Sequence, residues 1–206
     1  MEITKIEKQK KFKNRYNIFL DNQFAFGLFE DTILKFGLRT GDKPEEPILK
    51  EIREFDEFGY GKKIAYSFLS YKQRSKKEII KKLSQKKISS ATIEKITDLL
   101  ENQKYVDDKI YAKNFLEDRL THKPVGKRLA RLKLLEKGIE KEIAENIIEE
   151  NYSGEKEFEL ANEVLKKYQK KIRYKDDADK KSKCYRFLIS KGFEFEVVSR
   201  VLSINF

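Results

Sequence analysis

Few residues in this 206-residue sequence are of the types that support acid–base, nucleophilic or metal chemistry. The sequence contains one histidine, His122, and one cysteine, Cys184. A nucleophilic cysteine needs a basic partner, and a zinc site needs several histidine, cysteine or carboxylate ligands. We interpret His122, in a Thr-His-Lys-Pro segment, as an exposed loop residue, and Cys184 as a small buried residue. The sequence therefore predicts no catalytic pair and no cofactor, and we expect no enzymatic activity.

Two groups of carboxylates are spaced closely enough to suggest a divalent cation. They are the pair Asp107-Asp108 and the Asp-Asp-x-Asp group at residues 176–179. A helix N-terminus, whose dipole favours acidic side chains, accounts for the first pair, and a solvated loop accounts for the second group. Segment 59–63, Gly-Tyr-Gly-Lys-Lys, lacks the spacing of a phosphate-binding loop. We expect no metal and no nucleotide at these places.

Positive charge is the remaining chemical feature, and it is unevenly distributed. Residues 1–60 hold 11 Lys/Arg and 12 Asp/Glu, whereas the rest of the chain holds 35 and 23. Residues 61–91 carry ten Lys/Arg against one glutamate, residues 119–137 seven against one, and residues 170–191 nine against three aspartates. Clustered basic residues indicate a polyanion or an acidic protein groove as partner, and a solvated lysine-rich surface is the alternative.

The part of the chain that must position these charges contains a repeat of about fifty residues, present three times. Ala-x-x-(Phe/Val)-Leu occurs at 65–69, 112–116 and 161–165, and Leu followed five residues later by Ile or Phe occurs at 83/88, 134/139 and 188/193. Such spacings place apolar residues on one helix face, so each unit predicts three helices. Gly138 and Gly192 suit the left-handed C-cap of a second helix, where the first unit has Lys87.

The basic segments fall on or before the second helix of each unit, which predicts one long positive surface if the units stack in register. Arg128 and Arg131 share a helix face. The alternative for either arginine is an ion pair with Glu136 or a glutamate of 140–163 that serves stability alone. The candidate binding residues are Arg74, Lys76, Lys77, Lys81, Lys82, Lys127, Arg128, Arg131, Lys133, Lys181, Lys183 and Arg186.

The first sixty residues predict a small α+β domain. Segments 16–20 and 23–28 flank Asp21-Asn22 and predict a β-hairpin. Ile3 and Ile6 predict an earlier strand that the charged run 8–13 interrupts, and helices are expected over 30–36 and after Pro47. We place the domain limits at 1–59, 60–108, 109–152 and 153–206.

Local signals mark helix starts and the cellular compartment. Ser75 and Glu78 fit a capping box, and Ser89-Ser90 and Asp107-Asp108 predict two further helix N-termini. No apolar run approaches the ~18 residues of a membrane span, and the first residues lack the apolar stretch of a signal peptide. Together with the single cysteine, these features predict a cytoplasmic protein.

Several of these motifs resemble the RecX family of recombination regulators. They are residues 68–75 with Glu78 and Leu83, residues 105–108 followed by Ala112, residues 126–139, and residues 187–193. The resemblance implies tandem three-helix units that form an elongated, curved molecule. It also implies binding in the groove of RecA recombinase filaments, inhibition of ATP hydrolysis and strand exchange, and a role in DNA repair and the SOS response.

We therefore predict a mainly α protein with three tandem three-helix repeats behind a small β-containing domain. The expected partners are a RecA recombinase filament and DNA, which is bound weakly, with tolerance of sequence and strong salt dependence. We expect a monomer that does not bind membranes. The alternative is a sequence-specific DNA-binding transcriptional regulator that uses one unit as a helix-turn-helix. Such a protein would strongly prefer one DNA site.

Overall fold

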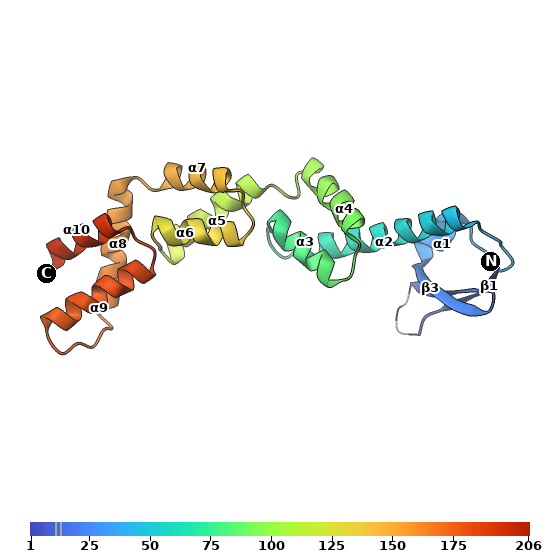
Figure 1. Cartoon of the computed structure of the whole chain (residues 1–206), viewed down its shortest axis with the longest axis horizontal. Coiled ribbons are helices and arrows are strands. Elements are labelled where there is room, and N and C mark those ends of the chain that lie inside the picture. Colours follow the sequence, from blue (N-terminus) through green and yellow to red (C-terminus); the bar gives the residue numbers. More distant parts are fainter. Residues whose placement is uncertain (11, 13) are drawn as a thin grey trace. The chain divides into compact units, whose positions relative to one another are not determined.

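The computed structural model describes residues 1–10, 12 and 14–206, which form three strands followed by ten helices (Figure 1). The chain divides into two compact units. Unit 1 contains residues 1–72 and 80–102, and unit 2 contains residues 73–79 and 103–206. The mainly helical fold with a small N-terminal sheet confirms the predicted fold class.

The N-terminal sheet is antiparallel, in the order β1 (Ile3–Lys8), β2 (Arg15–Leu20) and β3 (Gln23–Phe29). Asp21 and Asn22 join β2 to β3 with φ angles of 48° and 65°. Two successive left-handed residues give the turn whose twist matches a hairpin, and Asp and Asn tolerate that conformation. The predicted hairpin and earlier strand are both confirmed. Lys11 and Lys13 of the charged run lie outside the described residues.

Two helices follow the sheet, and the second is longer than the sequence indicated. Helix α1 (Glu30–Phe36) matches the predicted span, and α2 runs over Glu46–Leu69. Helix α2 continues through Gly59 and Gly61, where we had placed the end of the first domain. The first helix of the first repeat is therefore not short. Gly61 lies against α4, since a Cβ on it would lie 2.4 Å from Ile96 Cδ1. The four domain limits remain predictions.

Asp56 joins the sheet to α2. Its buried carboxylate accepts hydrogen bonds from the Phe29 N–H at 2.6 Å and from Thr32 Oγ1 at 2.7 Å. Leu28 and Ile52 are buried in the same apolar core. A buried carboxylate is tolerated where such donors satisfy it, so these contacts fix α2 against the end of β3.

Helices α3 (Lys76–Gln85) and α4 (Ser90–Asn102) begin at the predicted caps. Ser75 N–H donates to Glu78 Oε2, and Glu78 N–H donates to Ser75 Oγ, each at 3.3 Å. These two bonds confirm the capping box. Ser89 Oγ accepts the Thr92 N–H at 3.3 Å and so caps α4.

The second and third repeats are separate three-helix cores. Helices α5 (Asp108–His122), α6 (Lys127–Glu136) and α7 (Lys141–Asn151) form repeat 2, and α8 (Gly154–Gln169), α9 (Asp177–Ser190) and α10 (Phe195–Asn205) form repeat 3. The repeated motif residues are buried in these cores: Leu116, Leu134 and Ile147 in repeat 2, and Leu165, Leu188 and Val201 in repeat 3. Asp107 accepts two N–H groups of α5, as predicted from the sequence.

Within unit 2, the second helices of repeats 2 and 3 are in contact, and the N-terminus of α6 meets the C-terminus of α9. Gly126 N–H donates to Lys191 O at 2.9 Å, and Arg128 N–H donates to Gly192 O at 3.1 Å. The N-terminus of α6 thereby satisfies its free donors on the C-cap of α9. Ser75, at the start of α3, donates from Oγ to Lys137 O at 2.7 Å, beside the C-cap of α6.

The residues that the sequence offered as candidates for chemistry can now be located in the fold. Cys184 is fully buried, as predicted, and burial raises the pKa of its thiol. His122 is exposed, as predicted, but it is the last residue of α5 and not a loop residue. The described residues contain no group of three or more His, Cys, Asp or Glu able to hold a metal ion. None of the helices in the described part of the chain is both long and apolar enough to cross a membrane.

Candidate protein and nucleic-acid interface

A groove between α6 and α9 brings three of the predicted arginines together. Arg128 and Arg131 line it from α6, and Arg186 lines it from α9. Apolar side chains lie between these charges, namely Leu132 and Leu135 from α6 and Tyr185 and Ile189 from α9. We call this surface, lined by these residues, the arginine groove.

Leucine is unusually exposed in the arginine groove. Leu132 is 52% exposed and Leu135 is 37% exposed, and Tyr185 is 38% exposed. Contiguous exposed apolar side chains rimmed by charge are typical of surfaces that bind another protein. The groove therefore combines apolar area with guanidinium groups that bind carboxylates or phosphates in bidentate fashion.

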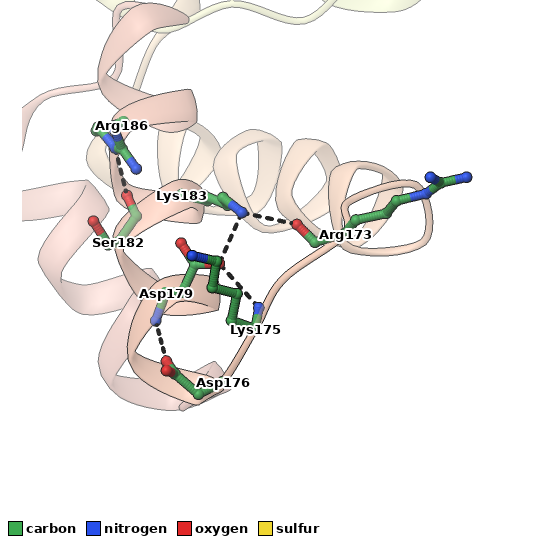
Figure 2. A network of polar contacts seen from close by, with 7 residues as sticks. All are labelled: Arg173, Lys175, Asp176, Asp179, Ser182, Lys183 and Arg186. Atoms are coloured by element: carbon green, nitrogen blue, oxygen red, sulfur yellow. Dashed lines mark hydrogen bonds and ion pairs between the residues drawn. The ribbon is translucent and has the colours of Figure 1, made fainter.

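The three arginines differ in what holds them. Arg131 Nε lies 2.7 Å from Glu145 Oε1 and donates to Oε2 at 2.9 Å. This is the ion pair that the sequence offered as an alternative, so Arg131 has a stabilising role within repeat 2. Arg128 is exposed and has no side-chain partner among the described residues. Arg186 Nε makes only a long bond of 3.4 Å to Ser182 O (Figure 2).

Lys183 is held by Asp179 of its own helix and by the loop before α9. Its Nζ donates to Asp179 Oδ2 at 2.7 Å and to Arg173 O at 3.0 Å (Figure 2). Asp176 caps α9 by accepting the Asp179 N–H at 2.7 Å. The hydrogen bond from Lys183 and the Lys175 N–H keep the pKa of Asp179 below its usual value. The acidic group at 176–179 thus forms a helix start and not the solvated loop that the sequence suggested, while Lys181 is exposed on α9.

Lys127 is also engaged, through Glu157 of α8. Glu157 is 1% exposed and accepts the Lys127 N–H at 3.0 Å, with Lys127 Nζ 3.8 Å from its other oxygen. Burial raises the pKa of Glu157, and the nearby Glu194 charge adds to the rise, although Lys127 and the backbone of Glu194 oppose it. Lys127 therefore serves the junction of α6 with α8.

Some of the predicted binding residues around α3 make contacts within the protein, and others are exposed. Lys76 N–H donates to Asp108 Oδ1 at 2.8 Å, and the aliphatic stem of Lys77 packs against Gly138. Lys82 lies over the Phe68 ring at 5.3 Å. Arg74 is half-buried close to Glu78, and Lys81 is exposed.

Glu78, Tyr111 and Lys137 form a polar cluster between the start of α3 and repeat 2. Lys137 Nζ donates to Glu78 Oε1 at 2.7 Å. Burial would raise the pKa of Glu78, but hydrogen bonds from Lys137 and the Ser75 N–H, with the charges of Lys137 and Arg74, lower it. The bond to Glu78 raises the pKa of Lys137, and burial raises that of the Tyr111 phenol. This cluster joins the start of α3 to repeat 2 within unit 2, and the Glu78 and Lys137 side chains are already paired.

A second basic surface was only partly predicted from the sequence. It is a hollow lined by α5, α6, α8 and α9 and by residues that directly follow α5, α8 and α9. Its cationic residues are Arg119, Lys123, Lys133, Lys167, Lys171 and Lys191. Among the residues that the structure describes, no carboxylate lines this surface, which we call the lysine hollow. Lys133 was predicted from the sequence, and four of the other five lie in the basic segments 119–137 and 170–191. Lys167 lies outside both segments, so only the tertiary fold places it with the others.

The fold and these surfaces define a class of protein: a tandem three-helix repeat protein with a small β domain and basic surfaces on its repeats. Family models match along the chain. They are the regulatory protein RecX N-terminal domain at residues 1–43 and the first, second and third three-helix domains of RecX at 62–98, 107–147 and 155–202. The chain belongs to the RecX family of regulatory proteins.

Individual relatives agree with this assignment. The chain is 33% identical to the regulatory protein RecX of Leuconostoc mesenteroides over 99% of its own length and 77% of the relative's. It is 35% identical to that of Staphylococcus aureus, over 98% and 74% of the two chains. A crystal structure of regulatory protein RecX matches with a TM-score of 0.70 and 28% identity, covering 97% of this chain and 98% of the other. RecX from Lactobacillus salivarius matches with a TM-score of 0.64 and 25% identity, over 72% and 96%.

Proposed function

We propose that this chain binds RecA recombinase filaments on DNA and inhibits their ATP hydrolysis and strand exchange. Membership of the RecX family along nearly the whole chain is the observation that carries the proposal. A regulator of this kind works by occupying a surface of its target, so it needs no active site of its own. We further propose that it acts in the cytoplasm, as a monomer, in DNA repair and the SOS response.

The arginine groove supplies a physical basis for recombinase contact. Arg128 is exposed and unpaired among the described residues, so it can bind a carboxylate of the partner in bidentate fashion without breaking an internal ion pair. Leu132 and Leu135 are then removed from water on binding, which favours association at roughly 25 cal/mol per Å² of apolar surface. Central arginines with apolar neighbours are typical binding hot spots.

The remaining candidate residues contribute through charge. Many weak contacts to a repetitive filament add through effective concentration, so exposed cations such as Lys81 and Lys181 assist binding without forming a site individually. DNA alone is bound weakly, with tolerance of sequence and strong salt dependence, because phosphate contacts release counterions.

The decisive experiment measures ATP hydrolysis by RecA on single-stranded DNA at increasing concentrations of this protein. We expect inhibition by the wild-type chain. Replacing Arg128 and Leu132 by alanine should raise the half-inhibitory concentration at least tenfold, since hot-spot side chains each contribute more than about 1 kcal/mol. An unaffected ATPase rate at saturating wild-type protein would refute the proposal.

The matched control replaces Arg173 and Leu34 by alanine. Both are exposed and lie outside the groove, and Figure 2 shows the Arg173 guanidinium directed away from the network around Asp179. This control should inhibit like the wild type. A protein that instead selects one DNA sequence strongly over random DNA, and leaves the ATPase unchanged, would be a helix-turn-helix regulator.

A further inference from the structure

We infer that the lysine hollow is a binding site for the phosphodiester backbone of nucleic acid, separate from the arginine groove. The inference rests on the proposed function only in the choice of nucleic acid as the polyanion. The hollow gathers six cationic side chains from three helices and from the segments that follow α5, α8 and α9, and none of the described residues that line it is a carboxylate. Such a one-sign concavity focuses the electrostatic potential and attracts anions.

The cations of the hollow are largely available for a ligand. Lys123, Lys133 and Lys171 have no side-chain partner among the described residues, and Lys167 pairs with Glu163 on the exposed side of α8. These amino groups remain hydrated in the free protein, so a phosphate can replace water without breaking a buried ion pair. The lysines of the hollow differ in this respect from Lys183 and Lys137, whose amino groups already donate hydrogen bonds to Asp179 and Glu78 respectively.

Aromatic rings form part of the hollow and position its other cations. Tyr168 and Phe187 stack with their ring centroids 3.8 Å apart, and Lys191 Nζ lies 5.4 Å from the centre of the Phe187 ring. Arg119 lies 5.3 Å from the Phe115 ring. Cations over ring faces keep their charge while losing freedom, so less entropy is lost when they bind a phosphate.

The hollow and the groove use different faces of α6. Lys133 lines the hollow, whereas Arg128, Leu132 and Leu135 line the groove, and Leu129 lies between the two faces and lines both surfaces. One pair of adjacent repeats can therefore hold nucleic acid on one side of α6 and protein on the other. A single three-helix unit could form neither surface alone, because both need residues of repeats 2 and 3.

The test measures binding of a labelled thirty-nucleotide oligo-dT and a labelled duplex by fluorescence anisotropy between 50 and 200 mM salt, without recombinase. The hollow variant carries Lys123→Gln, Lys133→Gln and Lys171→Gln. For single strands the slope of log affinity against log salt is about −0.7 per phosphate contact. Removing three contacts should flatten that slope by about 2, so the wild-type affinity should fall about 20-fold more than the variant's over this salt range.

The control variant carries Lys113→Gln, Lys141→Gln and Lys166→Gln, which removes the same charge from exposed lysines of unit 2 outside the hollow. Its salt slope should remain within 0.5 of the wild-type value, and a Lys-to-Arg triple variant in the hollow should bind like the wild type.

Equal flattening of the salt slope in the hollow and control variants would overturn the proposed site, because it would show that binding depends on the overall charge of the protein. The two probes show whether single strands or duplexes are preferred. Loss of oligo-dT binding with retained ATPase inhibition would separate this site from the proposed function.

Discussion

The junction between successive second helices makes a sharp prediction at glycine. Gly192 has a φ of 82°, and a Cβ on it would lie 2.3 Å from Leu129 Cβ and 2.4 Å from the Leu129 backbone nitrogen. Gly37 is also left-handed, at 61°, but a Cβ there would meet nothing within 4 Å. The two glycines therefore separate the cost of backbone conformation from the cost of close approach.

The expected losses follow from those contacts. The left-handed conformation costs an alanine about 1–2 kcal/mol, of which roughly 0.4–1 kcal/mol is offset because alanine also restricts the unfolded chain. Gly37→Ala should therefore cost about 1 kcal/mol. Gly192→Ala must in addition push α6 away from the C-cap of α9, and overpacking of this kind costs about 1–3 kcal/mol more. We expect a total loss of about 2–4 kcal/mol.

Urea unfolding followed by circular dichroism measures the two losses, and amide hydrogen exchange shows where they act. A chain with two compact units need not unfold in one step, so the exchange of α6 and α9 amides is the more specific measurement. Gly192→Ala should speed exchange in both helices, while Gly37→Ala should affect the N-terminal sheet and α1. Equal losses for the two variants would refute the close approach of α6 to α9.

Three further predictions concern polar groups and one cap. Because the pKa of Glu78 is lower in the folded state, its ionised carboxylate adds to the free energy of unfolding above the unfolded pKa of about 4.3. That stabilisation is lost as pH falls through the folded pKa. Glu78→Gln should abolish this pH-dependent loss, measured by urea unfolding at pH 7 and pH 3. The raised pKa of Glu157 has the opposite sign, so its charge destabilises the fold increasingly as pH rises from about 4.3 through the folded pKa. Glu157→Gln should remove that dependence in the same titration, whereas Glu157→Ala should cost about 1–3 kcal/mol because it leaves the Lys127 N–H unpaired. Lys87→Gly should be neutral or stabilise by up to about 1 kcal/mol in urea unfolding, since Lys87 has a φ of 60°.

Local features were predictable from the sequence because their partners lie within a few residues. The capping box of Ser75 and Glu78 and the turn at Asp21-Asn22 depend on neighbours, and the structure contains both. The uninterrupted α2 was not predictable, since glycine commonly ends a helix. Here Gly61 is retained inside the helix because α4 approaches too closely for a side chain.

The binding surfaces were less predictable because the residues that form them are far apart in the sequence. Glu145, the partner of Arg131, lies 14 residues away on another helix, and many glutamates of 140–163 were equally plausible. Charge counting found the segments that contribute to the lysine hollow but not the hollow itself. Lys167 belongs to it only because α8 lies beside α5 and α9. A charge pattern thus indicates the kind of ligand, while the fold selects which cations remain available.

The three C-caps explain why the repeat is not uniform. Gly138 and Gly192 have φ angles of 84° and 82°, and both are closely approached by the preceding second helix, through Lys77 and Leu129 respectively. Lys87 adopts the same conformation in repeat 1, although lysine is disfavoured there. Glycine is thus found where backbone conformation and close approach both require it. In the described part of the chain α3 is the first of the second helices, so no preceding second helix approaches Lys87 as Lys77 and Leu129 approach the two glycines.

The N-termini of the second helices show the complementary difference. The N-cap residue of α6 is Gly126, which has no side chain to accept a hydrogen bond. Backbone carbonyls at the C-cap of α9 and the carboxylate of Glu157 accept the free N–H groups instead. The N-terminus of α9 instead uses Asp176, within its own loop. The start of α6 is therefore completed by repeat 3, and the same contacts bring Arg128 and Lys133 beside α9 to form the groove and the hollow. Binding surfaces and repeat stacking are in this way one structural feature, so a variant that separates α6 from α9 should lose both protein and nucleic-acid binding together.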